Sequence, residues 1–252
     1  MLRAGLGLVT AALGDFEEGI ALGKQAIREA EASQHPFSIL YAVRHLILTY
    51  LLRGFFSDSE ALADREFALA TEHAFAVMLP AALHHRGYVY TCSGRIAEGV
   101  TLLEQAHHIA ESAGPKSDLV LITLALVEAY VAAGKLEQAL ERATEALRLA
   151  RERNERAFEA FAIELLADIA ASRIPCDFAE AEASYLDALR RLEVTGPRSW
   201  LARCHLSLGT LYRKNGRREA ARKHLTMATA MLADMGMHHW LESAHAETQE
   251  LG

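Results

Sequence analysis

The chain has 252 residues, and 51% of them are hydrophobic, which is enough to bury a sizeable core. Its formal charge is -7 and it carries no long run of Lys or Arg, so the sequence disfavours nonspecific binding to nucleic acid. It contains neither an apolar stretch of about 18 residues nor a leader with a cleavage pattern, so we expect a cytoplasmic protein without a membrane span.

Leu, Ala, Glu and Arg dominate the sequence, Pro numbers only 5, and β-branched residues are sparse. This usage favours helix nearly everywhere and predicts an all-α fold. The three cysteines, Cys92, Cys176 and Cys204, are widely separated and show no metal-ligand spacing. We expect reduced thiols packed against apolar neighbours.

Hydrophobic pattern and turn residues together predict helix pairs along the whole chain. In chain order, the expected helices are residues 2–13 and 15–33, 37–53 and 57–73, 77–93 and 95–112, 117–133 and 135–153, 155–172 and 177–195, 198–215 and 217–236, and finally 238–251. Pro36, Pro80, Pro115 and Pro197 fall between pairs or at a first helical position, and Pro175 falls in a corner. No proline therefore interrupts a predicted helix.

A repeated corner marks the middle of each predicted pair. The corner positions are Gly14, Gly54, Gly94, Gly134, Cys176 and Gly216, with spacings of 40, 40, 40, 42 and 40 residues. A glycine at the end of a helix adopts the left-handed conformation that terminates it, and the next helix begins within a residue or two. The spacing therefore indicates an internal repeat.

Other positions recur in step with the corners. An aromatic residue lies four positions before the corner as Tyr50, Tyr90, Tyr130 and Tyr212, and a glycine lies seven before it as Gly7, Gly87 and Gly209. Small residues also recur five and twelve positions after the corner, as at Gly99 and Ala106. We expect the small residues to let two helices approach and the aromatic ring to fill the adjacent gap.

One copy of this pattern is complete. It reads Leu208-Gly209-x-x-Tyr212-x-x-x-Gly216-x-x-x-x-Ala221-x-x-x-Leu225-x-x-Ala228 and resembles the tetratricopeptide repeat, with weaker copies over essentially the whole chain. The resemblance implies a right-handed superhelix of α-helix pairs, a solenoid that binds partners on its concave side. Repeats longer than the usual 34 or so residues resemble those in the C-terminal arms of large bacterial signalling ATPases. Those proteins include regulators related to MalT, and cyclases that carry ATPase and repeat modules.

The repeat predicts the division of the chain. We expect about six repeats and a C-terminal capping helix, namely residues 1–36, 37–76, 77–116, 117–154, 155–197 and 198–237, with the cap at 238–252. The first pair carries no cap of its own, which favours self-association into a homodimer or continuation from a longer protein.

Catalytic signatures are absent from the sequence. It contains no phosphate-binding Gly-x-x-x-x-Gly-Lys-Ser/Thr, Gly-x-Ser-x-Gly, His-Glu-x-x-His, Cys-x-x-Cys or calcium loop. We therefore expect no enzyme activity and no cofactor in these residues. If an ATPase or cyclase module is attached upstream, its active site lies there.

Two surface features have alternative interpretations. His238, Glu242 and His245 share a face of the last helix and form a weak candidate metal site, although a solvated polar face is the favoured interpretation. The basic residues between Arg213 and Lys223 could contact phosphate, but solvation of that end of the chain is favoured.

Candidate partner-binding residues follow from the expectation that the first helix of each pair lines the concave surface. The inward positions are Arg44, His45, His84, His85, Tyr88, Glu128, Glu164, Asp168, Arg203 and Arg213. The set is basic and rich in imidazole early, acidic in the middle and basic at the end, which suits a peptide of alternating charge. The competing interpretation is that these are solvated residues without a role. The Lys and Asn pairs of a carboxylate clamp do not occur at these positions.

The sequence thus predicts a scaffold that binds a protein or peptide, as part of a bacterial signalling or transcription-regulating protein. The alternative is a small-molecule sensing arm, which the resemblance to MalT-like ATPases and nucleotide cyclases implies.

Overall fold

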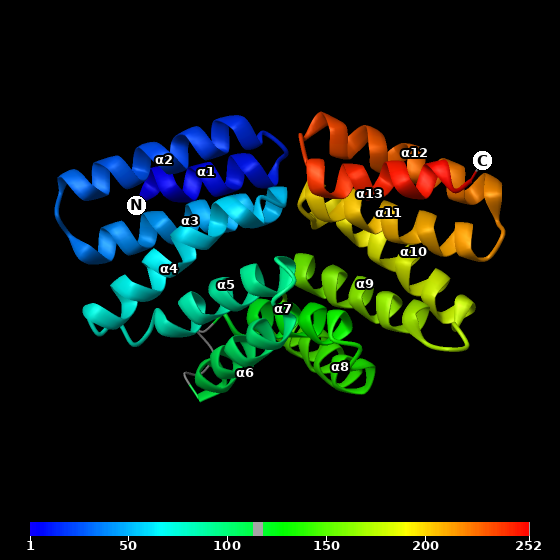
Figure 1. Ribbon diagram of the computed structural model, residues 1–252, viewed down its shortest axis with the longest axis horizontal. Coiled ribbons are helices and arrows are strands. Elements are labelled where there is room, and N and C mark those ends of the chain that lie inside the picture. Colours follow the sequence, from blue (N-terminus) through cyan, green and yellow to red (C-terminus); the bar gives the residue numbers. More distant parts are fainter. Residues whose placement is uncertain (113–117, 252) are drawn as a thin grey trace. The chain divides into compact units, whose positions relative to one another are not determined.

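The computed structural model describes residues 1–112 and 118–251, and within them the chain is all-α, without a strand (Figure 1). The helices are α1 (Leu2–Ala12), α2 (Phe16–Ala32), α3 (Pro36–Arg53), α4 (Phe56–Glu72), α5 (Leu79–Cys92), α6 (Ile96–Ser112), α7 (Leu119–Ala132), α8 (Leu136–Glu152), α9 (Arg156–Ser172), α10 (Phe178–Thr195), α11 (Arg198–Lys214), α12 (Arg218–Asp234) and α13 (His238–Gln249). Every end lies within two residues of its expected position. The predicted fold class and helix order are confirmed.

The chain divides into two compact units, residues 1–133 with α1 to α7 and residues 134–252 with α8 to α13. The division falls at the corner before α8, inside the predicted repeat 117–154. Pro115 and the predicted boundary between the third and fourth repeats lie outside the described residues. The division into six repeats stays a prediction.

The glycine corners have the predicted left-handed backbone. Gly14, Gly54, Gly94, Gly134 and Gly216 have φ values of 108°, 84°, 85°, 70° and 72°. In three corners, the amide after the glycine donates to the carbonyl of the recurring tyrosine at 2.9 Å, as Arg95 does to Tyr90. This bond satisfies a carbonyl at the end of the helix and explains why the aromatic position and the corner recur together.

The corner at Cys176 is built differently. Helix α9 already ends at Ser172, and α10 begins after Asp177, whose carboxylate accepts a hydrogen bond from the amide of Glu180 at 3.1 Å. At this corner α9 ends in an extended residue, Arg173, without a left-handed glycine, and the aspartate caps the start of α10. Cys176 is exposed, which corrects the expectation that all three thiols are packed in apolar surroundings, whereas Cys204 is buried as expected.

Close contact between the two helices of a pair depends on the recurring small residues. A Cβ atom on Gly7 would lie 2.7 Å from the carbonyl oxygen of Gly19, and one on Gly87 would lie 3.0 Å from that of Gly99. The neighbouring Tyr90 ring is buried. The predicted pairing of a small residue with an aromatic one is confirmed, because a larger side chain would separate the helices.

Successive pairs stack through the second helix of one pair against the first helix of the next, and their first helices also contact one another. In residues 1–133, α1 contacts α3, α3 contacts α5 and α5 contacts α7, whereas the second helices α2, α4 and α6 make no comparable contacts with one another in the described part of this unit. Residues 134–252 follow the same rule, with α9 against α11 and α11 against α13. Within each unit the first helices are therefore the more tightly packed layer, and that layer forms the inner side of any curvature.

The turns between pairs share a feature that the sequence analysis did not predict. Gln34, Ala74 and Asn154 adopt left-handed φ values of 53°, 53° and 57° although none is glycine. Beyond Ala74, Met78 and Ala82 join Leu40 and Ala70 in a core cluster that links the second pair to the third. Packing across the pairs thus holds a backbone conformation that costs a residue with a Cβ atom roughly 1 kcal/mol or more.

The approach of α5 to α6 gives a direct test. We expect Gly99→Ala to lower the free energy of unfolding by about 1–3 kcal/mol, because the added methyl group overpacks the pair. Its Cβ atom would overlap the Thr91 hydroxyl and would lie 2.7 Å from the Gly87 carbonyl oxygen. Thermal and urea unfolding followed by circular dichroism measures the change.

Gly5→Ala is the matched control, since its Cβ atom would meet nothing within 4 Å. Alanine is the better helix former, so this variant should be unchanged or more stable by up to about 1 kcal/mol. Equal stability of the two variants would show that the pair does not depend on glycine.

Candidate functional site

The inner layer of residues 1–133 carries a group of polar side chains that we call the first-helix face. It consists of Tyr41, Arg44 and His45 on α3, His84 and Tyr88 on α5, Asp118 before α7, and Glu128 on α7. Arg44 donates to the carboxylate of Asp118, which ties α3 to the start of α7. Arg44 was predicted as a binding residue but Asp118 was not. The position of Asp118 directly before an apolar helix was the sequence feature that could have identified it.

Three of the predicted groove side chains are buried. His84, His85 and Glu164 expose 3%, 0% and 2% of their surface, so they do not present side chains on an open surface. This corrects the expectation for those three positions. Each first helix packs against its own partner and against both neighbouring pairs, so only a narrow stripe stays open to solvent.

His85 forms a fully buried pair with Glu66 of α4. Its Nδ1 lies 2.6 Å from Glu66 Oε2, and both side chains are 0% exposed. His84 lies beside this pair, with its ring centroid 4.9 Å from that of His85. Burial, followed by the nearby His85 and Arg44, holds the pKa of His84 well below its usual range, so the ring is neutral at physiological pH. Glu66 Oε1, His84 Nδ1 and His85 Nε2 have no hydrogen-bond partner within the described residues.

His45 offers a defined hydrogen-bonding group on the first-helix face. Its Nδ1 lies 2.8 Å from the carbonyl oxygen of Tyr41, and a carbonyl can only accept, so Nδ1 carries the proton. Burial, then the charge of Arg44, lowers the pKa of His45 despite the opposing hydrogen bond to Tyr41. Nε2 of the neutral ring is consequently an acceptor.

Tyr88 and Glu128 complete the half-exposed part of this face. The Tyr88 ring centroid lies 6.4 Å from that of Phe56 and 6.4 Å from that of His84. Its body is therefore held by aromatic neighbours while part of it stays accessible.

In residues 134–252 the predicted acidic positions belong to an internal network. Asp168 accepts a hydrogen bond from the Tyr185 hydroxyl at 2.5 Å, and Cys204 donates to the Tyr185 carbonyl oxygen at 3.8 Å. Burial raises the pKa of Tyr185 and of Cys204, and the charges of Asp168 and Glu164 add to the effect. These groups hold α9, α10 and α11 together.

The two predicted arginines of this unit both contact α13. The Arg203 guanidinium lies 5.0 Å from the Trp240 ring centroid. Arg213 pairs with Glu247 and Glu250, each at 2.6 Å, and the hydrogen bond that Arg213 donates to Glu247 raises the pKa of Arg213. Both side chains therefore attach the last helix.

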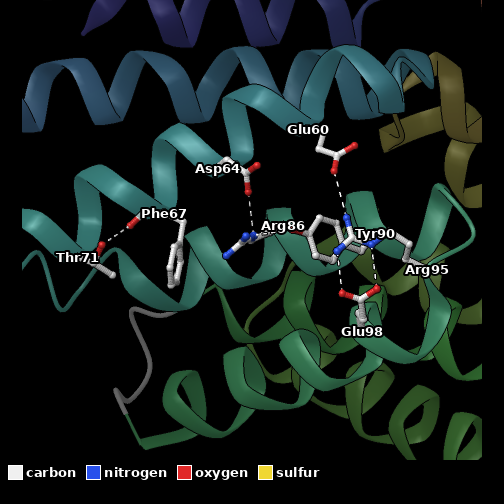
Figure 2. A network of polar contacts seen from close by, with 8 residues as sticks. All are labelled: Glu60, Asp64, Phe67, Thr71, Arg86, Tyr90, Arg95 and Glu98. Carbon is white, nitrogen blue, oxygen red and sulfur yellow. Dashed lines mark hydrogen bonds and ion pairs between the residues drawn. The ribbon is translucent and has the colours of Figure 1, made fainter.

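A second polar network lies on the other side of α5, where α4 and α6 flank it (Figure 2). Arg86 pairs with Asp64 at 2.9 Å and donates to the Tyr90 hydroxyl at 3.0 Å. Arg95 lies 3.5 Å from the Tyr90 ring centroid and pairs with Glu98, which raises the pKa of Arg95 and lowers that of Glu98. The cation-π contact between Arg95 and Tyr90 borders a shallow pocket of about 350 Å³.

The same pocket recurs one repeat earlier. A pocket of about 430 Å³ lies where α2 and α4 flank α3, and its Leu46, Tyr50 and Asp58 are 40 residues before Arg86, Tyr90 and Glu98. The sequence analysis did not predict these pockets, although the recurring tyrosine at their floor was recognised as part of the repeat. Their position follows from the gap that tighter packing of the first helices leaves between second helices.

The remaining candidates do not form a site. Among the residues that the structure describes, no three His, Cys, Asp or Glu side chains are arranged to hold a metal ion, and this includes His238, Glu242 and His245. In the basic segment, Arg217 pairs with Glu182 at 2.9 Å and Arg222 with Glu219 at 3.2 Å. Much of its charge is thus balanced within the protein.

A sequence profile of the tetratricopeptide repeat matches residues 78–152 and 175–234, which is more than half of the chain. The chain belongs to the tetratricopeptide-repeat family. A search of curated protein sequences found no match. Within residues 1–112 and 118–251, no helix of this tetratricopeptide-repeat protein combines the length and hydropathy that a bilayer crossing requires.

Solved structures with the same fold include RapI, NprR and a signal transduction ATPase. The apo form of RapI has a TM-score of 0.71 at 9% identity, over 93% of this chain and 84% of RapI. NprR in complex with its cognate peptide NprX has a TM-score of 0.58 at 15% identity, over 99% of this chain and 73% of NprR. A signal transduction ATPase with a tetratricopeptide-repeat sensor, from Pyrococcus horikoshii, has a TM-score of 0.61 at 15% identity, over 98% of this chain and 41% of that protein. At these identities the likeness establishes the fold.

The buried pair between α4 and α5 gives a double-substitution test. We expect Glu66→Leu to lower the free energy of unfolding by about 1–3 kcal/mol, because His85 is then buried without its partner. Adding His85→Leu should recover part of that loss, since removing both polar groups leaves none unsatisfied. Urea unfolding of the two single variants and the double variant measures the coupling between Glu66 and His85. If the losses in the free energy of unfolding were purely additive, the two side chains would not be coupled.

His205 and His224 predict a pH dependence. Their Nδ1 atoms lie 2.9 Å apart. Burial is the main cause that lowers the pKa of His205 to about 4, and the charges of His224 and Lys223 add to it. Burial also lowers the pKa of His224. Because the folded state resists protonation of His205, the neutral ring contributes to the free energy of unfolding. This contribution is fully present above pH 6.5 and is lost as the pH falls towards about 4. Urea unfolding across this window should show stability falling with pH.

His205→Gln should flatten that pH dependence, whereas the same change at the exposed His238 should leave it as it is. An unchanged slope in the His205 variant would remove this pair as the cause.

Proposed function

We propose that the chain acts by binding, and that its first-helix face in residues 1–133 holds a segment of a peptide or protein partner. The observation that carries this proposal is the half-exposed stripe of Tyr41, Arg44, His45, Tyr88 and Glu128, on the more tightly packed layer of a tetratricopeptide-repeat protein. The absence of the catalytic signatures from the sequence agrees with a function that requires no chemistry on the ligand.

The chemistry of this face fits an extended segment that carries both charges. Arg44 and Asp118 supply opposite charges that already neutralise each other in part, and Glu128 adds a second carboxylate. His45 Nε2 accepts a hydrogen bond, and tyrosine hydroxyls both donate and accept. Such groups satisfy the backbone amides and carbonyls of a bound segment, while tyrosine rings supply contact area at low entropic cost.

The known structures support a regulatory setting for this proposal. NprR was crystallised with a cognate peptide, and the Pyrococcus horikoshii ATPase carries its repeats as a sensor. We propose that this chain likewise serves as the partner-binding module of a bacterial regulatory protein in the cytoplasm, with an ATPase or cyclase module as its covalent partner. The six-repeat division of residues 1–237, with a cap at 238–252, is part of this proposal.

Binding can be tested with peptides selected from a random display library against the full chain. Arg44→Glu combined with Tyr88→Ala should weaken a selected peptide at least about tenfold in fluorescence anisotropy, because the change removes a cation and an aromatic anchor. Arg65→Glu is the matched control, since Arg65 lies on the second helix α4 and pairs with Glu31 of the second helix α2. It should bind within about twofold of the unaltered chain.

Equal binding by both variants, with circular dichroism unchanged, would exclude the first-helix face. A small-molecule effector is the alternative that the resemblance to MalT-like regulators favours. Thermal shift with a sugar and nucleotide library separates the two, because a ligand at about one hundred times its dissociation constant stabilises the folded state by about 2.7 kcal/mol. A shift with such a ligand and no selectable peptide would favour the sensing arm.

A further inference from the structure

Helix α1 has an exposed face that is entirely apolar. Leu2, Leu6, Val9 and Leu13 expose 94%, 55%, 57% and 70% of their surface. Their spacing of four, three and four residues places them in one stripe along the helix. We call these four residues the α1 stripe. The other exposed large apolar residues away from this helix in the described chain are scattered singly: Val77, Ile174, Leu186, Val194 and Met227.

The corresponding face is used for packing in the next repeat. The residues 40 positions after the α1 stripe are Ala42, Leu46, Thr49 and Arg53 of α3, and they expose only 3%, 3%, 1% and 7% of their surface. They are buried because α3 docks on the α1 and α2 pair. The α1 stripe is therefore an exposed surface of the kind on which a helix docks.

The helix cannot rotate to hide this stripe. Its opposite side, Ala4, Gly7 and Ala11, is already buried against α2, and a Cβ atom on Gly7 would lie 2.7 Å from the Gly19 carbonyl oxygen. Such close packing fixes the orientation of α1. Beside the stripe, a Cβ atom on Gly5 would meet nothing within 4 Å, which leaves room for another helix to approach.

We propose that the α1 stripe is a self-association surface, and that it packs against the α1 stripe of a second copy of this chain about a two-fold axis. Apolar residues alternating at three and four positions form the seam of a helix pair in which each side chain inserts between those of its partner. No charged residue belongs to the stripe, and the adjacent Arg3 is already paired with Glu29 of its own chain at 3.1 Å. Identical stripes can therefore meet without burying a charge.

The surface chemistry of the chain selects this partner. The last helix, α13, exposes polar side chains such as Glu242, His245 and Gln249, so it offers no apolar counterpart for head-to-tail association. The scattered single residues named above form no second stripe. The only matching surface among the described residues is the α1 stripe itself, and contact between identical patches closes at two copies.

The size of the stripe predicts a weak dimer. Each of its side chains exposes on the order of 100 Å² of apolar surface, which is a few hundred Å² per copy. Specific interfaces usually bury about 800 Å² per partner, and smaller ones belong to transient complexes. Monomer and dimer should therefore exchange, with their proportions set by protein concentration.

Sedimentation velocity of the full chain over a concentration series tests the proposal. The sedimenting mass should rise from 27.7 kDa towards twice that value as concentration increases. Leu6→Glu should raise the dissociation constant at least about tenfold, because two carboxylates would be placed in the seam. Val194→Glu, an equal change at a residue that is 80% exposed away from the stripe, should leave the association unchanged.

A second variant reports contact directly. In a Cys176→Ser background, which removes the exposed thiol, Leu6→Cys should give a disulfide-linked dimer on mild oxidation, and Val194→Cys should not. A monomer at every concentration, a dimer that persists in Leu6→Glu, equal loss in Val194→Glu, or growth beyond two copies would each overturn the proposal. Circular dichroism confirms that the variants are folded.

Discussion

Paired helices in this protein approach so closely that only small residues fit between them. The carbonyl oxygens of Gly19 and Gly99 occupy the space that a Cβ atom on the facing glycine would need. The rest of the architecture depends on this approach: the recurring tyrosine packs beside the contact, its carbonyl closes the glycine corner, and the corner returns the chain for the next helix. A repeat of this kind gains little alone, because each pair leaves an apolar face that only another pair covers.

The position of the first helices in the stack has a consequence for polar residues. A helix that contacts its own partner and both neighbouring pairs retains only a narrow open stripe, so side chains one turn apart can meet different environments. His84 and His85 are enclosed, with His85 paired to Glu66, while Tyr88 one turn further on stays half exposed. His84 remains neutral because burial penalises its charged form and lowers its pKa. The half-exposed groups that remain on this face are hydrogen-bonding side chains, tyrosine rings and one arginine.

Equivalent positions in successive repeats have different roles. The face of α3 that docks on the first pair corresponds to the exposed stripe of α1, and the pocket beside Tyr90 corresponds to the one beside Tyr50. Side chains distinguish the copies: Arg86 makes an ion pair where Leu46 contributes apolar surface. A repeat array can therefore vary its recognition surfaces repeat by repeat without disturbing the contacts that stack it.

The sequence by itself determined the helices, their ends within two residues, and the family, because glycine corners and small residues are local requirements that leave a periodic trace. It also indicated Arg44, His45, Tyr88 and Glu128 on the first-helix face. Tertiary structure decided the rest: the enclosure of His84, His85 and Glu164, the pairing of Arg44 with Asp118, and the attachment of α13 by Arg203 and Arg213. Those outcomes depend on residues from different helices meeting in space, and helical spacing places a side chain on a face without fixing what covers that face.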